Sequence, residues 1–386
     1  MSERLKTILW LVVAIIVIGG IWYEVSRKPT TPTTKEPIKI GGAFALTGYA
    51  NIWSEGEAKA AQLAVEEINS KGGVNGRPIK LVLEDYESKP EKVATVYHKL
   101  INIDKVIAII GPTWIEFAEV AVPIANQARV PTIMTSGDAR YETLARFGKF
   151  FFTTWPPSTY GHDYIIRRLQ ELGKTKVALI YDDGSIYSKE MAADFREKVK
   201  GTTIKLVTDI QVHMGSKDFK TEIIKIKKTD PEVIYTPLTL PDDINVFLKQ
   251  SIELGMENVM YIGSGNIFEE LLKPVYSSWK GEILFADVKL ESSRYQDFAR
   301  KFEAKFGKSP KVYAPSVTTA YDAVMILAEA LKSNPKTGEE LQQSLMKIKN
   351  FPGVSQESLS FDENGIVQLP KYIFKIFKDG KFVEVE

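Results

Sequence analysis

Hydrophobic residues along this chain alternate between two spacings. From Ile38 onward, short apolar runs are separated by longer stretches in which apolar residues recur every three or four positions, as Ala58, Ala61, Val65 and Ile68 do. The short runs predict strands at 38–46, 79–83, 106–110, 130–134, 176–181, 204–210, 233–235 and 259–262. The longer stretches predict helices at 54–71, from about 90, and at 115–128, 158–172, 189–199, 219–228 and 244–254. Because these strands are apolar on both faces, the pattern predicts parallel sheets covered by helices on two sides.

The alternation restarts after Phe150, which predicts two doubly wound α/β lobes of similar size. Beyond residue 290 the pattern changes to three helices, at 295–306, 317–331 and 338–348, followed by a tail rich in strands. In that tail Asp379-Gly380 predicts a hairpin turn between 372–377 and 382–385.

Loops at the carboxyl ends of the predicted strands are the expected place for a ligand. Open parallel sheets bind ligands beyond those ends, so two facing lobes would enclose a cleft between them. The candidate loops are 47–53, 111–114, 135–139, 182–187, 236–241 and 263–266.

The N-terminus carries an apolar run, Ile8 to Tyr23, flanked by basic residues on both sides. Its length is close to that of a membrane-spanning helix. A cleaved signal peptide is the alternative, but Ile18-Gly19-Gly20 is a poor processing site, which favours an uncleaved anchor with its N-terminus inside. We therefore expect a membrane anchor or signal segment at 1–28, a linker rich in Thr and Pro at 29–37, and an extracytoplasmic body.

Composition excludes several classes of function. Lys and Arg number 50 against 49 Asp and Glu, and such a balance is not that of a nucleic-acid-binding protein. The chain has no cysteine and three histidines far apart, which argues against thiol chemistry, zinc sites and other metal centres. No nucleophile elbow, phosphate-binding loop or metalloprotease motif is present. We therefore expect that the protein is not an enzyme and that it holds no cofactor and no metal ion.

From residue 38 to the end the sequence resembles the type I periplasmic binding proteins, in their leucine/isoleucine/valine-binding branch. The segments that carry the resemblance are IKIGGAFALTG (38–48), GEAKAAQLAVEEINSKGGVNGRPIKLVLEDYESKP (56–90), IIGP (109–112), VPTIMTSGDA (130–139), KVALIYDD (176–183), DFKTEIIKIKK (218–228), AYDAVMILAEAL (320–331) and FDENG (361–365). The resemblance implies two Rossmann-like lobes, 38–157 plus 288–358 and 158–287 plus 359–386, joined by three hinge crossings. It also implies hinge closure on a small ligand, which is then presented to the permease subunits of an ABC transporter.

Carried over to the first lobe, the resemblance points to three candidate ligand-binding segments. Trp53 stands where relatives place an aromatic at the cleft mouth, although it could equally pack against the following helix. Thr113 and Trp114 follow a buried strand and begin a helix, a natural place for a carboxylate. Ile115 replaces the family's hydroxyl there, so Thr113 could substitute for it or simply cap the helix. The third segment is Ser136, Gly137 and Asp138.

In the second lobe the candidates are Tyr187, Thr239 and Gly265. Tyr187 matches the family's cleft-lining aromatic, with Ser188 where a glycine is usual. Gly265 stands where amino-acid-binding relatives carry an acidic partner for the ligand's ammonium. The altered set leaves the ligand open: an amino acid, a neutral or aromatic molecule, or a cation drawn to Asp138. A membrane-tethered sensor or adhesion ectodomain with the same fold remains the alternative to a transport receptor.

Overall fold

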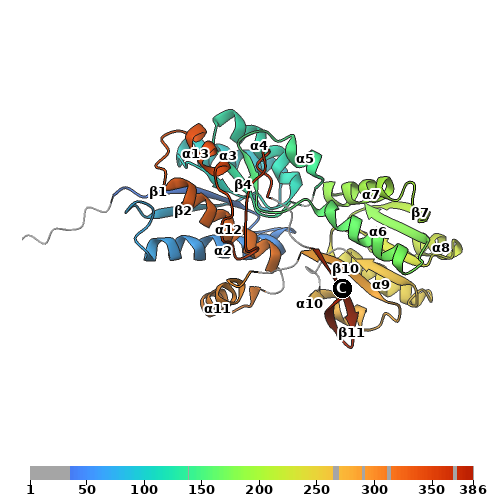
Figure 1. Cartoon of the computed structure of the whole chain (residues 1–386). Coiled ribbons are helices and arrows are strands. Elements are labelled where there is room, and N and C mark those ends of the chain that lie inside the picture. Colours follow the sequence, from blue (N-terminus) through green and yellow to red (C-terminus); the bar gives the residue numbers. More distant parts are fainter. Residues whose placement is uncertain are drawn as a thin grey trace, which may run out of the picture. The chain divides into compact units, whose positions relative to one another are not determined.

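The first of two sheets is parallel and has the strand order β2-β1-β3-β4-β5. A computed structural model describes residues 35–137, 139–263, 269–288, 292–310, 314–367 and 372–385 (Figure 1). The strands of this sheet are β1 (Ile38–Phe44), β2 (Ile79–Asp85), β3 (Ile109–Ile110), β4 (Thr132–Met134) and β5 (Phe151–Thr153).

Helices cover both faces of the first sheet, because successive strand residues point to opposite sides. Ile38, Ile40 and Phe44 of β1 point into one buried cluster, and Ala43 points into another. The first cluster is closed by α2 (Asn51–Ser70), α11 (Tyr295–Phe306), α12 (Ala314–Leu331) and α13 (Gly338–Met346). The second is closed by α3 (Pro90–His98), its π-helical continuation Lys99–Ile103, and α4 (Ile115–Ala128). Figure 1 shows α2 and α12 side by side.

The second sheet has the order β12-β11-β10-β9-β8-β6-β7 and is parallel except for its C-terminal hairpin. Its strands are β6 (Lys176–Asp182), β7 (Lys205–Val212), β8 (Val233–Thr236), β9 (Met260–Gly263), β10 (Ile283–Val288), β11 (Tyr372–Lys378) and β12 (Lys381–Val385). Its helices are α6 (Gly161–Glu171), α7 (Ile186–Lys198), α8 (Lys220–Lys228), α9 (Pro241–Glu253) and α10 (Glu269–Tyr276). Along β6, Val177 and Leu179 lie in the cluster with α6 and α7, whereas Ala178 and Ile180 lie in the cluster with α8 and α9.

The chain passes between the two sheets more than once. It leaves the first sheet after β5, through a 3₁₀ turn at 158–160, while a short helix at 141–145 connects β4 to β5. It returns after β10, since α11 and α12 belong to the core of the first sheet. Residues up to Val367 stay in that core, and β11 then pairs with β10 in the second sheet. The boundaries of the lobes and the hinge remain predictions.

The prediction of an α/β fold with two doubly wound sheets is confirmed. Most predicted elements appear within a few residues of their expected bounds, and α4 and α11 match theirs. The strands β5 and β10 and the helices at 141–145 and 269–276 were not predicted. The helix predicted at 54–71 begins earlier, at Asn51, so Ser54 and Glu57 lie inside it and their side chains are buried.

The predicted membrane anchor, 8–23, lies outside the described residues. Within the described part of the chain, no helix combines the length and apolarity that crossing a membrane requires. Residues 38–386 form one compact unit.

Candidate functional site

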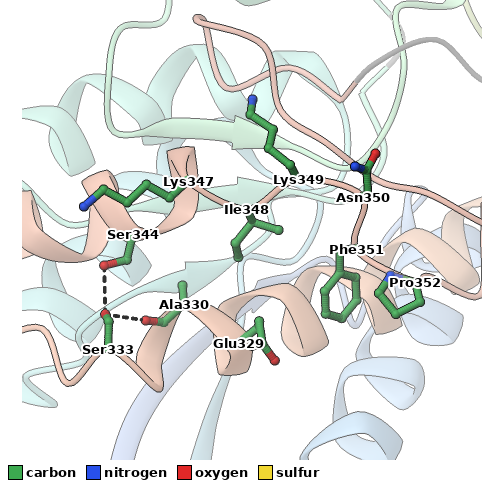
Figure 2. A pocket seen from close by; sticks show the side chains of 10 residues that line it. All are labelled: Glu329, Ala330, Ser333, Ser344, Lys347, Ile348, Lys349, Asn350, Phe351 and Pro352. Carbon is green, nitrogen blue, oxygen red and sulfur yellow. Dashed lines mark hydrogen bonds between the residues drawn. The ribbon is translucent and has the colours of Figure 1, made fainter.

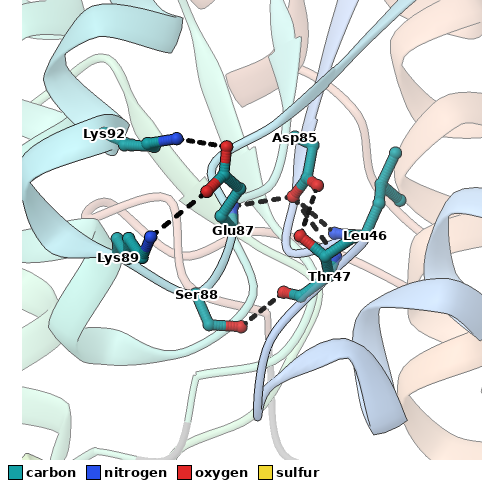
Figure 3. Close-up of polar contacts among 7 residues, drawn as sticks. All are labelled: Leu46, Thr47, Asp85, Glu87, Ser88, Lys89 and Lys92. Atoms are coloured by element: carbon teal, nitrogen blue, oxygen red, sulfur yellow. Dashed lines mark hydrogen bonds and ion pairs between the residues drawn. The ribbon is translucent and has the colours of Figure 1, made fainter.

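The loop between β1 and α2 is fixed by side chains at the end of β2 and directly after it (Figure 3). Asp85 accepts hydrogen bonds from the backbone N–H of Leu46 at 2.9 Å and from the hydroxyl of Thr47 at 2.7 Å. The Ser88 hydroxyl donates to the carbonyl of Thr47 at 2.7 Å and accepts from the N–H of Ala50 at 3.0 Å. These bonds set the point at which α2 begins, and with it the direction in which the first turn of the helix presents its side chains.

Trp53, on that first turn, is buried and packs against Trp114. Their ring centroids lie 4.7 Å apart in an edge-to-face arrangement, and only 4% of Trp53 is exposed. Trp53 belongs to the same buried cluster as Leu238, which follows β8 of the second sheet. The two tryptophans therefore lie where segments after the strands of both sheets meet, and Trp53 has a packing role there.

Thr113 is fully buried, and its hydroxyl is held by side chains of α2. It donates to Glu57 Oε2 at 2.7 Å and lies 2.5 Å from the hydroxyl of Ser54. Its backbone N–H donates to the Tyr86 hydroxyl at 3.2 Å. Because Thr113 has a single hydroxyl proton and gives it to Glu57, it offers none to a ligand in this arrangement. A role for Thr113 in place of the family's ligand-binding hydroxyl would therefore require the Thr113 hydroxyl to give up its hydrogen bond to Glu57.

Glu57 is a buried carboxyl group among these loops that sequence reasoning missed as a site residue. It is fully buried, and its Oε2 also accepts from Thr135 at 2.7 Å. Burial raises its pKa to about 7 against the opposing effect of the Thr113, Thr135 and Ser316 hydroxyls, which stabilise the charge. The sequence does hold a signal that Glu57 is buried, because Glu57 falls on the same face of its helix as the apolar residues.

The loop after β4 brings Ser136 and Gly137 beside Thr113. Thr113 and Ser136 form an isolated parallel bridge, in which the Trp114 N–H donates to the Ser136 carbonyl at 2.5 Å. A Cβ on Gly137 would lie 2.1 Å from the terminal methyl of Met134, so a larger residue there would require the Met134 side chain to move. Asp138 lies outside the described residues.

On the second sheet, Asp182 ties two strand-end loops together. Its carboxylate accepts from the N–H of Ser185 at 3.1 Å and of Thr239 at 2.8 Å, and the hydroxyls of these two residues lie 2.5 Å apart. Thr239 is therefore buried and partnered, while Tyr187, two residues after Ser185, is half-buried. Gly265 lies outside the described residues. Asp182 therefore has a structural role at the end of β6.

Two carboxylates connect the loops of one sheet to those of the other. Glu116, on the first turn of α4, accepts from the N–H of Ile186 at the start of α7. Glu190, one turn further along α7, accepts from the N–H of Arg140 at 2.7 Å and from the Thr143 hydroxyl. No pattern in the sequence predicts either contact, because each joins residues far apart along the chain. These contacts show that the segments after β3 and β4 contact the first turns of α7, the helix that follows β6.

A separate surface pocket of about 560 Å³ lies away from these loops (Figure 2). It is formed by α12, α13 and the segment that follows, and none of the predicted ligand-binding residues lines it. Its polar contacts are internal: the hydroxyls of Ser333 and Ser344 lie 2.8 Å apart, and Lys349 donates to the carbonyl of Phe361 at 2.6 Å. Within the described part of the chain, no cluster of His, Asp or Glu could hold a metal ion.

Two largely parallel sheets, each covered by helices and in contact through the segments after their strands, define a two-sheet α/β fold. The model of the periplasmic binding protein family matches residues 37–381, so the chain belongs to that family. It is 24% identical over 359 residues to the leucine-, isoleucine-, valine-, threonine- and alanine-binding protein of Pseudomonas aeruginosa, covering 91% of this chain and 93% of that protein.

Solved structures of the same kind are similar over most of the chain. The branched-chain amino acid transporter substrate-binding protein of Streptococcus pneumoniae, in complex with isoleucine, is 27% identical with a TM-score of 0.78, covering 90% of this chain and all of that one (100%). An ABC transporter solute-binding protein from R. palustris, in complex with benzoate, is 20% identical with a TM-score of 0.76, covering 90% and 95%. The resemblance found in the sequence is confirmed.

Proposed function

We propose that the chain is the solute-binding receptor of an ABC-type importer, which closes its two lobes on a small carboxylate. The observation that carries the proposal is the contact between the loops and first helical turns that follow strands of the two sheets. Glu116 contacts Ile186, and Glu190 contacts Arg140. Such loops are where open parallel sheets bind ligands.

The ligand class follows from the relatives. The similar structures bind isoleucine and benzoate, which share a carboxylate beside an apolar group. In this chain the Trp53 and Trp114 rings supply apolar surface, and the loop at Ser136 and Gly137 lies next to Trp114. The ligand contacts we propose are Trp53, Trp114, Ser136, Gly137 and Tyr187, with Thr113, Asp138, Thr239 and Gly265 completing or supporting the loops.

The body is proposed to lie outside the cytoplasm, tethered by the apolar segment 8–23 and the linker 29–37, with permease subunits as partners. Binding, not catalysis, is the activity we assign, since the family consists of binding proteins. Deleting residues 1–37 should move the protein from the membrane fraction to the soluble fraction without lowering its unfolding temperature. A truncated protein that still sediments with membranes would refute the tether.

A thermal-shift screen of the full chain tests the binding proposal. The panel contains amino acids, amides, polyamines, aromatic acids and other organic acids. A ligand at one hundred times its Kd adds about 2.7 kcal/mol to the free energy of unfolding, which gives a clear rise in unfolding temperature. We expect the largest rise with an amino acid or an aromatic acid. A rise with polyamines alone would refute the carboxylate ligand, and no rise with any compound would refute the receptor.

A further inference from the structure

Glu57, on α2, connects the loops that follow β3 and β4 of the first sheet. Its Oε2 accepts from Thr113, in the loop after β3, and from Thr135, in the loop after β4, both at 2.7 Å. Ser316, at the start of α12, also stabilises the carboxylate. A single carboxyl group therefore sets the positions of both loops while lying out of contact with solvent.

The charge of Glu57 decides which way the hydroxyl protons around it point. When Glu57 is ionised it can only accept, so Thr113 and Thr135 both direct their protons toward it. Ser54 must then donate to Thr113, because the Thr113 proton is already used. When Glu57 is protonated, it donates to one of the threonines, and that threonine's own proton becomes available elsewhere.

The surroundings of Glu57 make this change accessible near neutral pH. No ion pair between described residues includes Glu57, and the titratable side chain that faces it is Tyr86, from the loop after β2. Burial raises the pKa of Tyr86 well above 10, so Tyr86 stays neutral. From α12 and the loops after β3 and β4, the groups that face Glu57 are hydroxyls, which do not titrate in this range.

We infer that Glu57 takes up a proton when a carboxylate ligand binds to the loops above it. Two negative charges in a region closed to water repel each other strongly, and protonation of Glu57 removes that repulsion. Protonation also releases a hydroxyl donor in the loops that the ligand contacts. Glu57 is thus a positioning residue that links ligand affinity to pH. The inference rests on the proposed function, since it requires the ligand's carboxylate at these loops.

The linkage has a definite sign. Where Glu57 is already protonated in the free protein, binding needs no proton, and affinity does not depend on pH. Where Glu57 is ionised, each binding event consumes a proton, so affinity falls as pH rises. Since Glu57 in the free protein has a pKa of about 7, we expect the Kd to rise roughly tenfold between pH 6 and pH 8.

Isothermal titration calorimetry of the full chain in detergent micelles tests this. The probes are L-isoleucine, benzoate and 3,4-dihydroxybenzoate, and the one that binds most tightly is titrated in buffers with different ionisation enthalpies. The dependence of the observed heat on buffer enthalpy gives the number of protons taken up. We expect close to one proton at pH 8 and close to none at pH 5.5.

Two variants separate this role from a purely structural one. Glu57→Gln keeps the shape and is always neutral, so it should bind without proton uptake and with a Kd that changes less than twofold from pH 6 to pH 8. Glu66→Gln, on the exposed side of the same helix, should behave as the wild type. Proton uptake that persists in Glu57→Gln, or a wild type that takes up none, would overturn the inference while leaving the receptor intact. If none of the three probes binds, the proposed carboxylate receptor fails first, and the inference with it.

Discussion

The substitution Glu57→Gln should make the free energy of unfolding less dependent on pH. The pKa of Glu57 is about 7 in the folded protein, against an ordinary value of 4.5. A raised carboxyl pKa stabilises the fold fully below the unfolded value, and this contribution is lost as pH rises from about 4.5 through about 7. The difference corresponds to about 3 kcal/mol, because each pKa unit is about 1.4 kcal/mol. Glutamine has no proton to lose, so the variant avoids this loss.

Urea unfolding of the ligand-free protein at several pH values between 4 and 8.5 measures the effect. The free energy of the wild type minus that of Glu57→Gln should fall by about 3 kcal/mol across this range and then level off above pH 8. Other buried acids such as Asp243 and Asp322, whose pKa values are raised to about 6, affect both proteins alike and cancel in the difference. Glu66→Gln is the matched control and should run parallel to the wild type. Parallel curves for wild type and Glu57→Gln would refute the burial argument.

Three further substitutions test other parts of the structure. Tyr187→Ala should weaken ligand binding at least tenfold with little effect on unfolding temperature, as calorimetry and a thermal melt would show; unchanged affinity would mean that the cleft lies elsewhere. Asp322→Ala leaves the N–H groups of Val354 and Ser355, both now bonded to it at 2.8 Å, without acceptors, and should lower the free energy of unfolding by about 2–4 kcal/mol in urea titrations. A loss below 1 kcal/mol would contradict that bonding. Glu190→Ala removes one connection between the sheets and should raise the radius of gyration measured by small-angle X-ray scattering of ligand-free protein; an unchanged radius would argue against it.

Much of the fold was predictable, because it depends on local patterns. The strands at 176–182 and 233–236 are apolar on both faces, and only a sheet covered on two sides buries such segments. The strand at 151–153 was missed because three residues are too few to establish a period, and the short strand at 283–288 was missed as well. These are failures of local signal at short elements.

The candidate site was less predictable, because its contacts join residues distant in sequence. Thr113 was named for its hydroxyl, but its partners Ser54 and Glu57 lie more than fifty positions away, and no spacing rule pairs them. The role of Trp53 was left open between cleft and packing, and its burial shows that packing is part of the answer. Only the tertiary structure shows which acceptor receives the single hydroxyl proton of Thr113.

The late return of the chain to the first sheet has a consequence for its synthesis. All five strands of that sheet lie before residue 154, yet one of its faces is covered by α12, which ends at Leu331. A nascent chain therefore exposes an apolar sheet face until more than 150 further residues have left the ribosome or the translocation channel. We therefore expect a fragment that ends after β5 to leave part of this face uncovered and to aggregate.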